Sequence, residues 1–185
     1  MRCFIAIDLD ETLKADLVDL QEQIQREVDL PWGVCKWVKP DAIHLTLNFL
    51  GDIGDTQSVE VCRIARAVCA RHQRFSIHLA GMGHFGGRSA RVLWLGMVSP
   101  SLLALQSDLA EELDRAGWPK EAKRFTGHLT LCRIRNTQAG FELAKAGHKY
   151  ENVDLGMLPV ETVTVYQSQL QSDGPQYTVL GRYEL

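Results

Sequence analysis

The sequence has no CxxC pair, no long hydrophobic run and no excess of positive charge. Its cysteines are odd in number and widely spaced, so they predict reduced thiols in a reducing compartment, not a zinc ribbon, a thioredoxin-like site or a disulfide framework. The longest apolar stretches, such as 92–98, are far shorter than the ~18 residues that a membrane span requires. Residues 1–10 are strand-like and unlike a signal peptide, so we expect a cytoplasmic protein that does not contact a membrane.

The net charge of −3 argues against a broad phosphate-binding surface whose affinity depends on releasing many counterions. A nucleic-acid substrate that is held over only one or two nucleotides is compatible with it. Basic residues are dense in 118–125 and 132–135, although the lysines there are most simply part of a solvated surface.

Hydrophobic patterns divide the chain into strands and amphipathic helices. The order strand, helix, strand, helix, strand occurs twice, with one extra strand at the end, although the two halves share little identity. This order predicts an α+β fold with two similar lobes related by a pseudo-twofold axis, each a sheet packed against helices. No low-complexity linker separates the lobes, so residues 1–185 are predicted to form one bilobal domain, by default a monomer without an obligate protein partner. The predicted strands are 2–9, 42–51, 75–81, 90–98, 127–134, 160–170 and 176–185, with a turn at 172–175, and the predicted helices are 11–28, 55–72, 99–117 and 137–147.

One short motif, GMGHFG at 81–86, has the letters of a dinucleotide-binding loop. Such a loop works only when a helix follows, because the amino terminus of that helix holds the pyrophosphate. A strand-like segment follows here, so we interpret these glycines as part of a β-hairpin or loop.

The letters HLTL occur twice, at 44–47 and 128–131, each time in a strand-like stretch. Residues i and i+2 of a strand point to the same face, so each copy directs two leucines into a core and an imidazole and a hydroxyl to the opposite side. One copy alone would most simply contain a structural histidine. Two copies at matching places in the order of elements predict that both pairs face one cleft: His44 with Thr46, and His128 with Thr130.

Two imidazoles in one cleft can supply a general base and a general acid, because histidine titrates near pH ~6.5. Threonine hydroxyls can donate hydrogen bonds to anionic oxygens, and a guanidinium matches the geometry of phosphate. Arg133 is the candidate guanidinium, although strict alternation turns it away, so it needs a bulge or the end of the strand to reach the cleft. This set is suited to in-line displacement at phosphorus, where the base activates the nucleophile and the acid protonates a departing ribose oxygen.

Other histidines leave a metal site as an alternative. Zinc needs a third and usually a fourth protein ligand or water, and His78 and His84 are available in principle. No acidic residue or cysteine stands at ligand spacing from either HLTL, so we expect neither a metal nor a cofactor. His72 and His148 are most simply surface residues.

The paired strands resemble the 2H phosphoesterases, and among them the bacterial and archaeal RNA 2′,3′-cyclic phosphodiesterases, also called LigT-like 2′-5′ RNA ligases. The resemblance covers essentially the whole chain, and it implies two antiparallel-sheet lobes with helices on their outer faces. The segments that carry it are 2–9, 37–53, 84–97, 124–135 and 165–185.

This resemblance implies hydrolysis of RNA terminal 2′,3′-cyclic phosphates, or of nucleoside 2′,3′-cyclic phosphates, to 2′-phosphomonoesters. It implies neither metal nor cofactor, and 2′-5′ ligation would be the same step in reverse. His44 would donate a proton to the leaving 3′-oxygen, and His128 would accept one from water. Thr46, Thr130 and Arg133 would hold phosphate oxygens.

The residue before the second HLTL, the function of the cleft and the role of its aromatic residues each allow more than one interpretation. Gly127 stands where the family often has proline before the second histidine, and glycine loosens the entry to a strand. A non-catalytic module that binds nucleotides or RNA ends in the same cleft is the alternative function. Four aromatic side chains near the proposed cleft could stack on a base, although burial in the core is the simpler interpretation of each: Trp37, Phe49, Phe85 and Tyr166.

Overall fold

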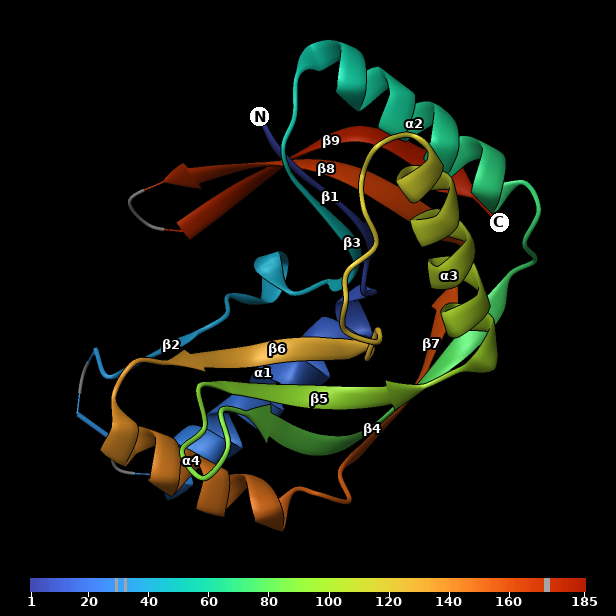
Figure 1. Cartoon of the computed structure of the whole chain (residues 1–185). Coiled ribbons are helices and arrows are strands. Elements are labelled where there is room, and N and C mark those ends of the chain that lie inside the picture. The colour runs from blue at the N-terminus through green and yellow to red at the C-terminus, as the bar shows by residue number, and fades with distance from the viewer. Residues whose placement is uncertain (29, 32, 172–173) are drawn as a thin grey trace.

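The computed structural model describes residues 1–28, 30–31, 33–171 and 174–185, and its strands form two antiparallel sheets (Figure 1). One sheet has four strands in the order β3-β1-β8-β9, and the other has five in the order β2-β6-β5-β4-β7. The predicted α+β fold with two antiparallel sheets is confirmed. The strands are β1 (Arg2–Ile7), β2 (Cys35–Trp37), β3 (Leu45–Asp52), β4 (Phe75–Phe85), β5 (Val92–Val98), β6 (His128–Ile134), β7 (Asp154–Val160), β8 (Thr162–Gln171) and β9 (Gly174–Glu184).

Each sheet is covered by its own pair of helices. α2 and α3 pack on the four-stranded sheet, and α1 and α4 pack on the five-stranded sheet (Figure 1). The helices bury the apolar stripes that the sequence predicts, and polar side chains cap several of them: Asp10 caps α1, Ser99 caps α3 and Asn136 caps α4. The helices are α1 (Glu11–Glu27), α2 (Asp55–Cys69), α3 (Pro100–Arg115) and α4 (Thr137–Lys149), with a short 3-10 helix, η1 (Pro40–Ala42), before β3.

Both halves of the chain contribute strands to each sheet. β1 and β3 from the first half share a sheet with β8 and β9 from the second, through the pairing of β1 with β8, whereas β4 of the first half joins the sheet of β5 and β6. Each half therefore places its HLTL strand in one sheet and passes a later strand to the other. The two lobes are not the two halves of the sequence, and this exchange of strands makes each lobe depend on the other.

Two strands, β2 and β7, were not predicted. β2 has only three residues, too few for a recognisable alternation. β7 contains Gly156 and Pro159, which are typical of loops. Proline is tolerated here because β7 lies at the edge of its sheet and pairs only with β4, so the missing N–H leaves no ladder bond broken inside the sheet.

The glycine motif at 81–86 lies in the hairpin between β4 and β5. β4 continues as far as Phe85, and a six-residue loop, 86–91, leads to β5, so no helix amino terminus is present there to hold a pyrophosphate. The interpretation of this motif as a hairpin is confirmed. The predicted turn at 172–175 falls partly on residues 172 and 173, which lie outside the described residues.

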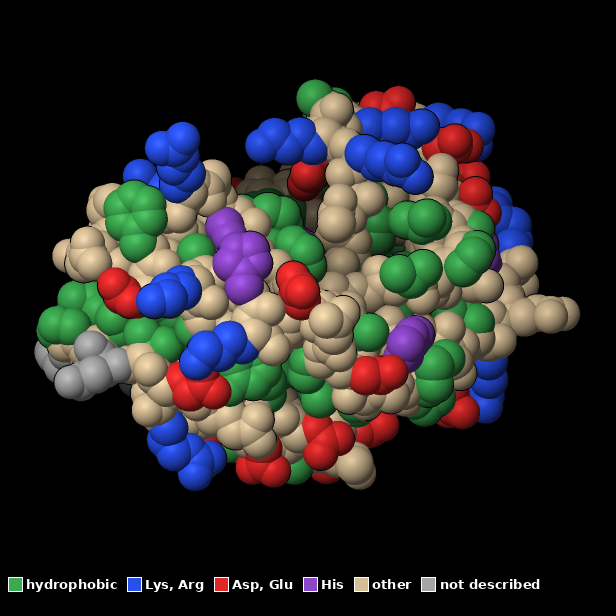
Figure 2. Space-filling view, turned by 90° about the horizontal axis from the view of Figure 1, so that it is seen from below, with side chains coloured by type: hydrophobic (Ala, Val, Ile, Leu, Met, Phe, Trp, Pro, Cys, Tyr) green, Lys and Arg blue, Asp and Glu red, His purple; other side chains and the backbone are tan. Residues whose placement is uncertain are grey.

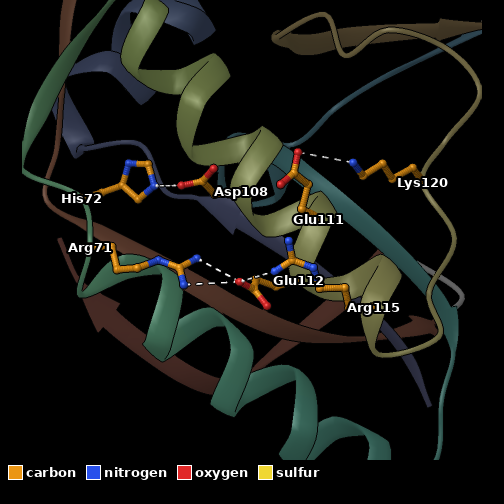
Figure 3. A network of polar contacts seen from close by, with 7 residues as sticks. All are labelled: Arg71, His72, Asp108, Glu111, Glu112, Arg115 and Lys120. Carbon is orange, nitrogen blue, oxygen red and sulfur yellow. Dashed lines mark hydrogen bonds and ion pairs between the residues drawn. The ribbon is translucent and has the colours of Figure 1, made fainter.

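A polar network joins the turn that follows α2, helix α3 and the segment that leads into β6 (Figure 3). His72 Nε2 lies 2.9 Å from the Asp108 carboxylate, so this largely buried histidine joins the turn after α2 to α3 and is not a plain surface residue. Lys120 pairs with Glu111 at 3.5 Å, and its backbone N–H donates to Asp114 at 3.2 Å. These contacts anchor the connection that ends at the second HLTL strand.

The outer surface carries charges of both signs. Figure 2 shows the face that carries α4, the underside in Figure 1, and there basic and acidic side chains are interspersed. Among the described residues, no helix is both long and apolar enough to cross a membrane.

Candidate active site

A cleft of about 830 Å³ lies where the two sheets meet. Its walls come from β3, β6, the segment from β2 to η1, and the end of the β8–β9 hairpin. β3 and β6 belong to different sheets, yet Cα atoms of the two strands come within 8 Å of each other. The cleft is lined by every site residue that the sequence suggested: His44, Thr46, His128, Thr130 and Arg133.

A β-bulge in β6 explains how Arg133 reaches the cleft. The pairing of β6 with β5 shifts by one residue after Thr130, which makes Leu131 an extra residue on β6. Leu131 and Cys132 are consecutive buried residues, and the alternation then resumes with Arg133 exposed. Of the two possibilities that the sequence left for Arg133, a bulge or the end of the strand, the structure has the bulge.

The first HLTL strand, β3, also has a β-bulge at the second leucine of its motif. β3 pairs with β1 so that Asn48 lies opposite Ile5 but Thr46 lies opposite Ala6, and Leu47 is the extra residue. The residue five positions after the histidine is again turned to the cleft, and in β3 it is Phe49.

The bulge in β6 is held from outside the strand by Gln21 of α1. This side chain is only 5% exposed, and its Nε2 donates to the carbonyls of Leu131 and Val38, each at 3.0 Å. The backbone N–H of Val38 donates to the same Leu131 carbonyl at 2.9 Å. The carbonyl at the bulge is therefore satisfied by two donors that the neighbouring strand β5 does not supply. Sequence reasoning missed Gln21, although its place four residues after Leu17 on the apolar stripe was a signal.

The tautomer of His128 follows from one hydrogen bond. Its Nδ1 lies 2.8 Å from the carbonyl oxygen of Thr126, and a carbonyl only accepts, so Nδ1 carries a proton. In the neutral ring the lone pair is then on Nε2. The ring meets Phe85 edge-on, with centroids 5.1 Å apart, and lies 6.4 Å from Trp94. A neutral His128 is thus held as a proton acceptor.

His44 lies among aromatic rings. It stacks on Phe4 with centroids 4.6 Å apart and meets Tyr177 edge-on at 5.1 Å. Burial lowers the pKa of His44 from 6.5 to about 4, while the charge of Asp8 and a hydrogen bond with the backbone of Ala42 act to raise it. At pH 7 the ring is therefore neutral in the free protein.

Asp8 is fixed near His44 by three donors. The Tyr166 hydroxyl donates to one carboxylate oxygen at 2.6 Å, and the buried Thr164 hydroxyl donates to the other at 2.9 Å. Arg182 lies 3.4 Å from the same carboxylate. Burial, and then the hydrogen bond to Asp8, raise the pKa of Tyr166 to about 12, so this phenol stays protonated and keeps donating.

Positive charge is concentrated in the cleft. Four cations line it, namely Arg2, Lys36, Lys39 and Arg133, and no Asp or Glu is among its described lining residues. Arg133 is close enough to Tyr177 for its charge to oppose the rise that burial causes in the pKa of that phenol. The chain as a whole carries a net charge of −3, so the cleft is a locally cationic surface on an acidic protein.

Aromatic side chains in the cleft are more exposed than expected. Phe49 is 53% exposed and Phe85 is 41% exposed, so the expectation that they belong to the core is wrong. Phe49 and Trp37 line the cleft, whereas Phe85 packs beside His128. Sequence reasoning missed Tyr177, because a tyrosine in a polar strand carries no sign of which face it takes.

Gly127 packs closely against the side chains of Met97 and Leu102. A Cβ at this position would lie 2.9 Å from the Met97 side chain and 3.1 Å from Leu102 of α3. The glycine that departs from the family's usual proline therefore lets the start of β6 sit directly against α3.

The remaining histidines lie apart from the cleft. His78 pairs with Asp154 at 2.9 Å, and His84 faces His148 with ring centroids 6.4 Å apart. Within the described part of the chain, no three His, Cys, Asp or Glu residues gather as metal ligands would.

The fold and the paired His-x-Thr strands are those of the 2H phosphoesterases. The sequence profile of the family described as LigT like Phosphoesterase matches the chain twice, over residues 7–94 and 95–177, so each match contains one HLTL. The chain belongs to this LigT-like phosphoesterase family.

Curated relatives share most of their length with the chain. A protein of Aquifex aeolicus named RNA 2′,3′-cyclic phosphodiesterase is 36% identical over 173 residues, which cover 90% of this chain and 90% of that protein. A protein of the same name from Methanothermobacter thermautotrophicus is 30% identical and covers 100% of this chain and 99% of its own.

Solved structures share the fold over the whole chain. The crystal structure of TT0787 of Thermus thermophilus matches with a TM-score of 0.81 at 27% identity, over 100% of this chain and 98% of that one. E. coli LigT complexed with 3′-AMP matches with a TM-score of 0.77 at 26% identity, over 100% of this chain and 97% of that one.

Proposed function

We propose that the chain hydrolyses the 2′,3′-cyclic phosphate at the end of an RNA strand to a 2′-phosphomonoester, without a metal ion. The observation that carries this proposal is one cleft that holds two His-x-Thr pairs among four cations and no acidic side chain in its described lining. The names of the curated relatives, RNA 2′,3′-cyclic phosphodiesterase, support the same reaction. The E. coli relative crystallised with 3′-AMP supports a nucleotide as ligand.

His128 acts as the general base in this proposal. Its Nδ1–H is held by the Thr126 carbonyl, so Nε2 is free to take a proton from the attacking water. The hydrogen bond to Thr126 thus orients the ring so that Nε2 is the atom that accepts the proton.

His44 acts as the general acid, and it must gain its proton when the substrate binds. Raising its pKa from about 4 toward 7 requires about 4 kcal/mol. A phosphate charge ~4 Å from the ring contributes about 4 kcal/mol at an effective dielectric constant of 20. The charge of the anionic substrate therefore favours protonation of His44, which then protonates the leaving 3′-oxygen.

Thr46, Thr130 and Arg133 hold the non-bridging phosphate oxygens. The hydroxyls donate single hydrogen bonds, and the guanidinium donates two in a planar fork. These donors stabilise the charge that develops on the pentacoordinate phosphorus between the two histidines. With a ribose 5′-hydroxyl in place of water as the nucleophile, the same groups would open the cyclic phosphate to a 2′-5′ phosphodiester and release the 3′-hydroxyl, which is 2′-5′ ligation.

The test is incubation with a nucleoside 2′,3′-cyclic phosphate and with an RNA that ends in one, with products separated by anion-exchange chromatography. We expect the 2′-monophosphate, with or without excess EDTA. Binding without any product supports the non-catalytic module instead, and loss of turnover in EDTA supports a metal enzyme. We also expect the protein to be a monomer, and light scattering on the protein as it elutes from a size-exclusion column checks its mass.

A further inference from the structure

A second cavity of about 600 Å³ adjoins the cleft. It lies between the end of α1, the start of β2 and the end of β6. Lys36 and Trp37 line both cavities, so the edge strand β2 forms the border between the cleft and the second cavity.

Cations run from the cleft into this cavity. Lys36 of β2 lies opposite Arg133 of β6 in the strand pairing, and Arg135, two residues further along the chain, lines the second cavity. The ion pairs within the described part of the chain involve other cations, so Lys36 and Arg135 have no carboxylate partner there. No Asp or Glu is among the cavity's described lining residues.

The rest of the second cavity suits a flat, partly polar ring. Val28 and Leu30 supply apolar wall and Trp37 supplies an aromatic one. Gln25 adds an amide at the rim, whose Nε2 donates to the Gln21 carbonyl at 3.2 Å, which leaves its oxygen able to accept from a base edge. Phosphate-binding cations next to an aromatic wall are the elements by which proteins hold single-stranded RNA.

We propose that the second cavity binds the nucleotide that precedes the terminal one, with its base beside Trp37 and its phosphate between Lys36 and Arg135. This inference rests on the proposed function, because it places the terminal cyclic phosphate in the cleft. The preferred substrate is then an RNA end of at least two nucleotides, and a mononucleotide fills only half of the site.

The experiment compares kcat/KM for adenosine 2′,3′-cyclic phosphate and for a tetraribonucleotide that ends in a 2′,3′-cyclic phosphate. The variant is Arg135→Gln, which touches only the second cavity, and the matched control is Lys145→Gln, which removes an exposed cation from α4 outside both cavities. Trp37 and Lys36 are unsuitable because they line the cleft as well.

We expect the wild type to favour the tetranucleotide by roughly tenfold or more, the gain from one stacked base with its phosphate. Arg135→Gln should lose about threefold to tenfold in kcat/KM on the tetranucleotide and keep the mononucleotide rate. Its salt dependence on the tetranucleotide should also become shallower, by about 0.7 in the slope of log kcat/KM against log salt concentration. Lys145→Gln should change neither rate.

Three results overturn the proposal while the proposed function stands: equal losses on both substrates, no loss on either, or the same loss from Lys145→Gln. If the wild type hydrolyses neither substrate, the proposed function fails, and the second-cavity proposal fails with it.

Discussion

The two HLTL strands are built on the same backbone and surrounded by different side chains. In each, the second leucine of the motif is an extra residue in a bulge, Leu47 in β3 and Leu131 in β6. In each, the residue five positions after the histidine is turned to the cleft, but it is Phe49 in β3 and Arg133 in β6.

The neighbours of the two histidines differ as well. His44 stacks on Phe4 and lies near the carboxylate of Asp8. His128 is oriented by the Thr126 carbonyl, and Gly96, which has no side chain, lies opposite it in the strand pairing. The repeated strand places the two imidazoles in one cleft, and we propose that their different surroundings make His44 the acid and His128 the base. Predictions that treat the two strands separately test this division of roles.

The largest effect is expected from removing either ring. His44→Ala and His128→Ala should each lower kcat on a nucleoside 2′,3′-cyclic phosphate by on the order of 10² or more, because each removes one partner of a concerted proton transfer. The double variant should lose far less than the product of the two factors, since the rings act as a unit. Far-ultraviolet circular dichroism checks that both variants fold. Near-normal turnover in either one contradicts the assignment.

The next largest effect is expected in how the free energy of unfolding depends on pH, and it should come from His44. The pKa of His44 is about 4 in the folded protein, against 6.5 for a fully hydrated histidine, so between these values the unfolded chain binds the proton more strongly. This contribution to stability is full above pH 6.5 and is lost as the pH falls toward 4. Between pH 7 and pH 5 the loss amounts to about 2 kcal/mol.

Urea unfolding of the wild type and of His44→Gln at pH 7 and pH 5 measures this loss. The wild type should lose about 2 kcal/mol more than the variant between the two pH values, because all other titrating groups are common to both proteins. An equal loss in both shows that His44 is not buried as a neutral ring.

The sequence was sufficient to predict which side chains of the repeated motif face the cleft, and to predict most of the helices and strands. Alternation in HLTL depends on local geometry alone, so the positions of His44 and Thr46 followed from the period of a strand. The amphipathic helices followed for the same reason. The three-residue β2 and the proline-containing β7 were missed, because tertiary pairing creates them and local pattern does not.

Features that depend on contacts between distant segments were beyond the sequence. The exchange of strands between halves, the pKa of His44 among Phe4 and Tyr177, and the partners of Gln21 all arise from residues far apart in the chain. The bulge in β6 is an intermediate case. The spacing between His128 and Arg133 indicated that a bulge, or the end of the strand, would be needed for Arg133 to reach the cleft. Whether the bulge is present depends on how β6 pairs with β5.

A third, smaller effect, on kcat and KM, is expected from the residues five positions after each histidine, Phe49 and Arg133. Arg133→Gln should lower kcat by about tenfold to a hundredfold, because the guanidinium neutralises charge that grows in the transition state. Phe49→Leu should leave kcat nearly unchanged and raise KM by about threefold to tenfold, as expected for a ring that contacts the base. Steady-state kinetics on adenosine and uridine 2′,3′-cyclic phosphates measures both. If Phe49→Leu lowers kcat as much as Arg133→Gln does, the two strands do not divide the roles as described.

The smallest effect is expected at Gln21, which touches neither the histidines nor Arg133. Gln21→Leu removes one of the two donors to the Leu131 carbonyl, so the bulge should hold less firmly and Arg133 should spend less time over the phosphate. We expect kcat to fall about threefold to tenfold and the free energy of unfolding to fall by about 1–2 kcal/mol.

A double variant separates positioning from stability. If Gln21 acts through Arg133, then Gln21→Leu in the Arg133→Gln background should lower kcat little further, whereas the loss of unfolding free energy should persist undiminished. A matched change on the same helix, Gln25→Leu, should leave kcat on the mononucleotide intact, since Gln25 lines the second cavity and does not reach the bulge. Additive losses of kcat in the double variant mean that Gln21 supports the fold in general. The β6 bulge would then be set by the β5–β6 pairing alone, as the β3 bulge is by its pairing with β1.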